Sequence, residues 1–342
     1  MKKLISVVLS LMILVLSLSA GTSAMAAQSA AKYGFQKKQY NSQSSTFNFD
    51  GKKSVKLVYD EAKNNYIVYL SNKVTKKGKV LFRTKDYTAL AINGNYVYYA
   101  EPSKGAIMRR NIKTKKAKKL VSFKKKKYNV QFLLCGERLV YNLKQYKNGG
   151  ELKKSFLYVT NLKGKNPKLI AKNVDSNMFS YNFMLYFTKG KNLMRYSFKE
   201  GTLGKRNVGL DMTNAKLIGM ENKTLYIAYI KGTAFNECNF YKADVEKQRY
   251  WKFESVKTDD PIHGLMVFES KAYITTGTGA GTAFAAVTGE RADFQTYENR
   301  DFTVCGDNLA FYRNSIVLDN YDINSKTNDY TFKQYMVKVK LK

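Results

Sequence analysis

Cysteine and histidine are scarce in this sequence, and their scarcity excludes several kinds of site. The 342 residues include three cysteines, Cys135, Cys238 and Cys305, and one histidine, His263. So few cysteines, and an odd number of them, do not make a disulfide scaffold. No Cys-x-x-Cys pair and no second histidine is present to build a Cys/His zinc site. We therefore expect no metal site, no cofactor and no recognisable catalytic residues, and cysteines that act as small apolar fillers.

Proline and long apolar runs are also rare. The chain has three prolines, and no long stretch keeps the apolar period of 3.6 residues that is typical of an amphipathic helix. The single long apolar run, Leu4 to Leu18, follows Lys2 and Lys3 and precedes the small-x-small pattern Ala24-Met25-Ala26. This order is typical of a signal peptide. We predict that residues 1–27 are removed on export, and that a secreted, extracellular chain remains with no transmembrane segment; retention at the cell wall stays open.

Acidic residues are scarce in the first part of the chain. Residues 27–210 contain 40 Lys and Arg against nine Asp and Glu, a net charge of +31, whereas residues 211–342 contain 17 of each. All of the excess positive charge of the mature chain therefore lies in its first part, where it would attract polyanions. Lysines outnumber arginines 49 to 10, which favours loosely specific binding because lysine lacks the bidentate fork of arginine.

The densest basic stretch runs from Lys113 to Lys127. We predict that it forms an anion-binding rim, with Tyr128, Tyr141 and Tyr146 placed to stack on sugars or bases. A solvated loop without a ligand is the alternative interpretation. The candidate polyanion-binding residues are Lys115, Lys116, Lys118, Lys119, Lys124, Lys125, Lys126 and Lys127.

Turn signals recur along the chain, and each is followed by a strand rich in Tyr, Val, Ile and Phe. Examples are Asn93-Gly94-Asn95 before Tyr96, and Cys135-Gly136-Glu137 before Leu139. The turns are centred on residues 51, 94, 136, 182, 222, 270 and 306, with a mean spacing of about 42 residues. Such a period, with four strands in each unit, predicts an all-β chain folded as a β-propeller. Seven blades fit the seven turns, and six and eight remain open.

The last repeat has too few strands for a complete blade. The segment 335–341 reads as its third strand, and the sequence stops before a fourth. We predict that residues near 33–40, within an N-terminal segment 28–45, supply the missing strand and close the ring over residues 46–342. Pairing of the two terminal strands would remove an exposed edge that otherwise invites aggregation.

One repeat carries a resemblance to known propellers. The strand Val97-Tyr98-Tyr99-Ala100, followed by Ile107-Met108-Arg109-Arg110-Asn111-Ile112, resembles a blade of the YWTD propellers of the low-density-lipoprotein receptor. It is more similar still to a bacterial secreted domain-of-unknown-function family with receptor-like propellers. The Tyr-Trp-Thr-Asp motif itself is absent. The resemblance implies a fold rather than a function.

These features favour a secreted, non-enzymatic binding module. We expect the basic first part of the chain to form one flank of the propeller and to bind an anionic cell-wall polymer or an acidic glycan. We expect the source to be a Gram-positive-like bacterium. Two alternatives remain open. One is an extracellular polysaccharide hydrolase or lyase with its site at the central channel, and the other is a scaffold for protein–protein interaction.

Overall fold

The strands predicted from the repeat are present in the computed structural model. It describes residues 47–49, 53–72, 78–174, 178–181, 183–221, 223–232, 235–258, 261–268, 271–278, 281–288, 291–297, 302–312, 315–323 and 332–340. Residues 1–27, predicted to be a signal peptide, and the segment 28–45 lie outside these residues. The described part forms 27 β-strands and one 3-10 turn, Glu61–Lys63. Within it, no helix combines the length and the hydropathy that a membrane span requires.

The strands form seven antiparallel sheets, numbered here in chain order. Sheet 1 contains β1 (Phe47–Phe49), β2 (Ser54–Asp60), β3 (Asn65–Ser71) and β4 (Lys79–Thr84). Sheet 2 contains β5 (Leu90–Asn93), β6 (Tyr96–Glu101), β7 (Ala106–Asn111) and β8 (Ala117–Ser122). Sheet 3 contains β9 (Asn129–Cys135), β10 (Arg138–Tyr146), β11 (Leu152–Asn161) and β12 (Lys168–Lys172). Sheet 4 contains β13 (Met178–Tyr181), β14 (Met184–Lys189), β15 (Asn192–Ser197) and β16 (Leu203–Arg206).

The remaining sheets come from the second part of the chain. Sheet 5 contains β17 (Lys216–Glu221), β18 (Thr224–Lys231), β19 (Glu237–Asp244) and β20 (Arg249–Lys257). Sheet 6 contains β21 (Ile262–Phe268), β22 (Lys271–Thr278), β23 (Gly281–Thr288) and β24 (Arg291–Tyr297). Sheet 7 has three strands among the described residues, β25 (Phe302–Tyr312), β26 (Ser315–Ile323) and β27 (Phe332–Lys340).

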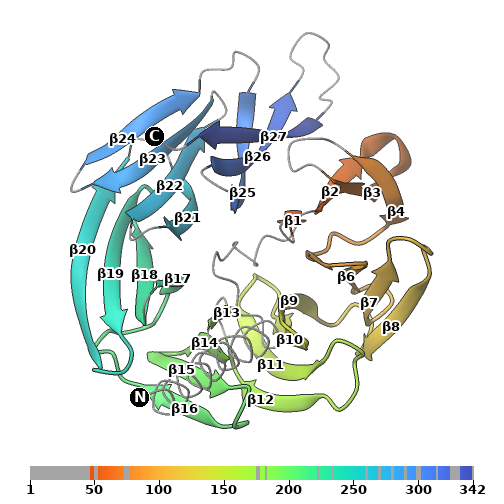
Figure 1. Ribbon diagram of the computed structural model, residues 1–342, viewed down its shortest axis with the longest axis horizontal. Helices are drawn as coiled ribbons and strands as arrows, with labels where there is room; N and C mark the ends of the chain where they lie inside the picture. The colour runs from red at the N-terminus through yellow and green to blue at the C-terminus, as the bar shows by residue number, and fades with distance from the viewer. Residues whose placement is uncertain are drawn as a thin grey trace, which may run out of the picture.

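Consecutive sheets lie side by side around a ring (Figure 1). The first strand of a sheet contacts the first strands of the preceding sheet: β5 contacts β1 and β2, and β21 contacts β17 and β18. Each sheet therefore begins at its inner strand and ends at its outer strand. The chain then crosses to the inner strand of the next sheet.

The apolar core lies between the sheets, because both faces of a sheet in the ring are covered. On β10, Leu139, Tyr141 and Leu143 pack toward sheet 2. Val140 points the other way and packs toward sheet 4. Burial on both faces explains why these strands read as almost continuous apolar and aromatic runs rather than as an alternation.

The turn signals coincide with residues in the left-handed region of backbone space. Gly94 has a φ of 58° and Gly136 a φ of 60°, as expected for glycine in a tight turn. The equivalent hairpins of sheets 4 and 5 place Phe183 and Lys223 there, with φ of 64° and 69°. The fold therefore imposes the turn even where the sequence offers no glycine.

Each sheet has two ends, which carry different connections. In sheet 2, the register pairs Ala106 with Ser122, so the β6–β7 turn and the crossing from β8 to β9 lie at one end. We call this end of the ring the crossover face. The β5–β6 and β7–β8 turns lie at the other end, the opposite face, where Tyr96 pairs with both Asn93 and Asn111.

Candidate anion-binding surface

The eight predicted lysines are divided between the two ends of sheet 2. Lys115 and Lys116 precede β8 and lie on the opposite face, whereas the loop Lys124–Lys127 follows β8 and lies on the crossover face. Lys118 and Lys119 lie on β8 itself, the outer edge strand, and are exposed. Since β8 has six residues, about 20 Å of strand separates the two groups. The eight lysines therefore do not form a single rim.

The pair on the opposite face belongs to a well-defined turn. Asn111 Oδ1 accepts hydrogen bonds from the backbone N–H groups of Lys113 and Thr114, at 2.8 and 3.0 Å. Lys115 is left-handed, with a φ of 57°, and its carbonyl accepts a hydrogen bond from Arg110 Nη1 at 2.7 Å. These contacts satisfy the backbone of the turn and leave its lysine side chains in solvent.

The loop Lys124–Lys127 packs on the β6–β7 turn, and this contact adds a lysine that the sequence did not point to. Phe123 N–H donates to Gly105 O at 2.8 Å, and Lys126 N–H donates to Pro102 O at 2.9 Å. Lys104 occupies the same turn and is exposed. We call the resulting group, Lys104 with Lys124, Lys125, Lys126 and Lys127, the lysine cluster.

A buried carboxylate lies beneath the lysine cluster. Glu101 is only 6% exposed, and its Oε1 lies 2.9 Å from Lys104 Nζ. Its Oε2 is buried and has no hydrogen-bond partner among the described residues. The hydrogen bond to Glu101 raises the pKa of Lys104 above its ordinary value. Lys104 is therefore held in place and charged, and Glu101 offsets one positive charge out of five.

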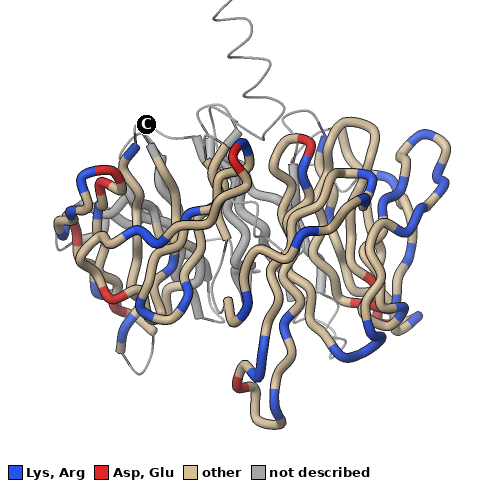
Figure 2. Tube along the Cα trace, turned by 90° about the horizontal axis from the view of Figure 1, so that it is seen from below, with Lys and Arg blue, Asp and Glu red and all other residues tan. Residues whose placement is uncertain are grey.

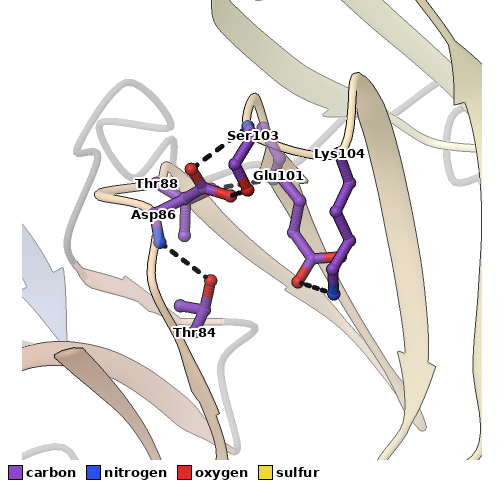
Figure 3. Close-up of polar contacts among 7 residues, drawn as sticks. Thr84, Asp86, Thr88, Glu101, Ser103 and Lys104 are labelled. Carbon is purple, nitrogen blue, oxygen red and sulfur yellow. Dashed lines mark hydrogen bonds and ion pairs between the residues drawn. The ribbon is translucent and has the colours of Figure 1, made fainter. Parts of the chain in front are cut away.

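A second acid fixes the turn to the preceding connection (Figure 3). Asp86, in the crossing from sheet 1, accepts hydrogen bonds from the N–H of Ser103 at 3.2 Å and from its hydroxyl at 2.6 Å. The N–H of Asp86 donates to Thr84 Oγ1 at 3.1 Å. Nearby, Thr88 Oγ1 accepts from the N–H of Ala100 at 2.8 Å. These hydrogen bonds attach the β6–β7 turn, which carries Lys104, to the crossing from sheet 1.

The charge imbalance is greatest around this cluster. Residues 85–128, which span sheet 2 and its two crossings, contain 13 Lys and Arg against two acids, Asp86 and Glu101. Both carboxylates are already engaged, that of Asp86 with Ser103 and that of Glu101 with Lys104. Among the described residues, none of Lys124–Lys127 forms an ion pair. Lys and Arg crowd one side of the ring, whereas acids and bases alternate on the other (Figure 2).

The three tyrosines predicted to stack on a ligand differ in their availability. Tyr141 is only 3% exposed and stacks on Tyr158 with a centroid distance of 5.1 Å, so the prediction is wrong for this residue. Tyr128 is half-buried, with Lys127 Nζ 5.6 Å from its ring centroid. Tyr146 is 41% exposed but lies on the β10 hairpin of sheet 3.

The cysteines that can be described are fillers of the core. Cys135 and Cys238 are buried and free, and burial raises the pKa of each thiol to about 12. Cys135 packs in the core between sheets 3 and 4. Across the described residues, no group of three His, Cys, Asp or Glu side chains lies close enough together to hold a metal ion.

Comparison with known proteins identifies the fold and leaves the family open. No protein-family model matches the chain, and no curated protein matches it. Among solved structures, uncomplexed Pyrococcus horikoshii acylaminoacyl peptidase matches with a TM-score of 0.54 and 10% identity, covering 89% of this chain and 54% of the peptidase. The β-propeller domain of the Trilobed protease from Pyrococcus furiosus matches with a TM-score of 0.53 and 8% identity, covering 90% and 97% of the two chains.

At such low identity, these matches show the fold alone. Together with the ring of antiparallel sheets they identify a β-propeller. The chain spans about half the length of the peptidase that it matches.

Proposed function

We propose that this β-propeller is a secreted, non-enzymatic module that binds anionic polymers of the cell envelope through the lysine cluster. The observation that carries the proposal is that the loop with Lys124–Lys127 is hydrogen-bonded to the turn that carries Lys104. The signal-peptide pattern of residues 1–27 supports export.

Physical chemistry favours a polymeric ligand. Five like charges held on neighbouring loops repel one another, and a polyanion relieves that repulsion while releasing its own counterions. Lysine ammonium groups act as point charges without planar geometry, so they neutralise phosphate, sulfate or carboxylate with little discrimination. The cluster is therefore suited to charge density along a chain, and we expect its binding to depend strongly on salt.

The test is a variant whose loop has lost its four positive charges, compared with a matched control. Lys124, Lys125, Lys126 and Lys127 are all replaced by Gln. The control replaces four exposed lysines of sheet 5 by Gln, which changes the net charge equally: Lys223, Lys231, Lys247 and Lys252. Binding of linear polyphosphate is measured by calorimetry over a series of salt concentrations. We expect the loop variant to bind more weakly and to lower the slope of log K against log salt by up to about 3.

The control separates a local site from the net charge of the protein. If both variants lose the same affinity, the lysine cluster is not a site and only the overall charge matters. If wild-type protein binds no polyanion at low salt, the proposed function fails altogether.

We also propose that the ring is a seven-bladed propeller, and that residues near 33–40 complete its last blade. We propose further that it is related to the secreted receptor-like propellers that its second repeat resembles. The order β25-β26-β27 and the contacts of β25 with β21 and β22 support β25 as the inner strand. The missing strand is then the outer one, beside β27. A chain that leaves this position crosses directly to β1, as it does between the other sheets.

A further inference from the structure

Three tyrosines form a continuous aromatic surface on the crossover face of sheet 1. Tyr59 on β2 and Tyr66 on β3 are directly paired across the strands, with ring centroids 5.1 Å apart. Tyr87, from the crossing to sheet 2, packs its ring 5.8 Å from that of Tyr66. Tyr59 is 45% exposed and Tyr87 is 59% exposed. Two of the three rings are therefore available to a ligand from solvent.

This aromatic surface adjoins the lysine cluster. Tyr87 immediately follows Asp86, whose carboxylate holds Ser103, and Ser103 immediately precedes Lys104. Lys126 is bonded to Pro102 of the same turn. A continuous chain of contacts thus leads from the tyrosines to the lysines along one face of the ring.

Polar groups surround the tyrosines. The Tyr59 hydroxyl donates to Asn64 Oδ1 at 2.9 Å, and Asn65 Nδ2 donates to Lys63 O at 3.2 Å. Arg83 on β4 reaches across β3 and pairs with Asp60 on β2. Two exposed lysines are close in sequence to these tyrosines: Lys63 in the turn between Tyr59 and Tyr66, and Lys85 two residues before Tyr87. The site therefore offers apolar ring faces bordered by amides, hydroxyls and ammonium groups.

We propose that Tyr59, Tyr66 and Tyr87 bind a sugar ring, and that together with the lysine cluster they select an anionic polysaccharide. This inference rests on the proposed function and names the class of polymer. The C–H face of a sugar packs on the face of an aromatic ring, and its hydroxyls bond to groups at the rim. The adjacent lysines then bind the charges that recur along the same polymer.

The geometry favours a sugar over a nucleobase. The planes of Tyr59 and Tyr66 are inclined by 50°, and those of Tyr66 and Tyr87 by 66°. Successive bases of a single strand stack best on aromatic platforms that follow one another with similar orientation. Rings inclined in this way offer no such series of parallel platforms, whereas one sugar needs only the face of a single ring.

The test compares ligands that carry the same number of charges. The variants are Tyr59→Ala and Tyr87→Ala, singly and together. The control is Tyr250→Ala on β20, because Tyr250 is 44% exposed and also packs on a neighbouring tyrosine, with a centroid distance of 6.0 Å to Tyr241. Each protein is titrated with linear polyphosphate, with oligothymidylate, and with carboxylated, sulfated and phosphate-linked oligosaccharides.

We expect at least one acidic oligosaccharide to bind wild-type protein more tightly than polyphosphate does. The double tyrosine variant should weaken that binding about tenfold or more, and it should leave polyphosphate binding unchanged. Tyr250→Ala should change neither.

Two results would overturn the inference while the proposed function stands. One is binding of polyphosphate in preference to every oligosaccharide, and the other is affinity for oligosaccharides that does not depend on the tyrosines. A selective loss of oligothymidylate binding in the double variant would assign the surface to single-stranded nucleic acid instead. Failure of wild-type protein to bind any of these polyanions would remove the proposed function itself.

Discussion

Gly105 allows the loop Lys124–Lys127 and the preceding Phe123, together called the lysine loop, to pack closely on the β6–β7 turn. It lies in the β6–β7 turn with a φ of 63°. A Cβ added there would collide with the carbonyl oxygen of Phe123 and would lie 3.0 Å from the N–H nitrogen of Lys125. Both are backbone atoms of the lysine loop, so no side-chain rotation relieves the collision. Gly105→Ala should therefore push the loop away from the turn.

The expected cost has two parts. An L-residue in the left-handed region costs about 1 kcal/mol more than glycine. Displacement of the loop also breaks the hydrogen bonds Phe123 N–H to Gly105 O and Lys126 N–H to Pro102 O, each worth about 1 kcal/mol. We expect Gly105→Ala to lower the free energy of unfolding by about 3 kcal/mol.

Gly94 provides the matched control. It lies in the same sheet, at the opposite face, with a φ of 58°, and a Cβ there would meet nothing within 4 Å. Gly94→Ala should cost only the backbone part, about 1 kcal/mol. Unfolding in urea, followed by far-ultraviolet circular dichroism, measures both variants, and polyphosphate affinity should fall for Gly105→Ala alone. Equal losses of stability in the two variants would refute the argument that the turn supports the lysine loop.

Further predictions concern the thiols, one half-buried tyrosine and the N-terminal segment. In a Cys305→Ser background, Cys135 and Cys238 should resist Ellman's reagent at pH 8 until the protein is unfolded, because burial raises each thiol pKa to about 12; rapid labelling of folded protein would contradict this. Burial likewise raises the pKa of Tyr229 from 10.0 to about 12. Its contribution to stability is therefore complete below pH 10 and is lost as the pH rises toward 12. Wild-type protein should lose more stability than Tyr229→Phe over this interval in urea titrations, and identical pH profiles would disprove the assignment. Removal of residues 28–45 should lower the melting temperature in calorimetry, and an unchanged value would exclude their pairing with β27.

Much of the fold followed from local sequence signals. The Gly94 and Gly136 turns and the strands after them were predicted because glycine tolerates positive φ and because aromatic and β-branched residues favour strands. The four-strand unit is confirmed for sheets 1–6. Of the segment 335–341, residues 335–340 lie in β27, the third strand of sheet 7, as predicted, and residue 341 lies outside the described residues. The hairpins at Phe183 and Lys223 carry no glycine, and the sequence predicts them from Asn182 and Asn222, the residues just before.

The candidate site was predicted in part. The sequence points to Lys124–Lys127 because they are consecutive. On the crossover face Lys124, Lys125 and Lys126 are exposed and Lys127 is half-buried, which agrees with a solvent-facing basic surface. Lys115 and Lys116 were grouped with them because they are near in sequence, yet β8 carries them to the other end of the sheet. Tyr141 was chosen in the same way and is buried, because its position on β10 points into the core between sheets 2 and 3.

The repeat, the strand content and the basic half of the chain can be read from the amino-acid sequence, since each depends on residues that are close together or on simple composition. Which charges and rings share a surface depends instead on how the sheets and their loops pack. Lys104 joins Lys124–Lys127 because two loops at one end of sheet 2 pack together, and Tyr87 joins Tyr59 and Tyr66 because a crossing folds back over a hairpin. Such contacts depend on strand direction and on packing between sheets, neither of which is encoded in the spacing of residues along the chain.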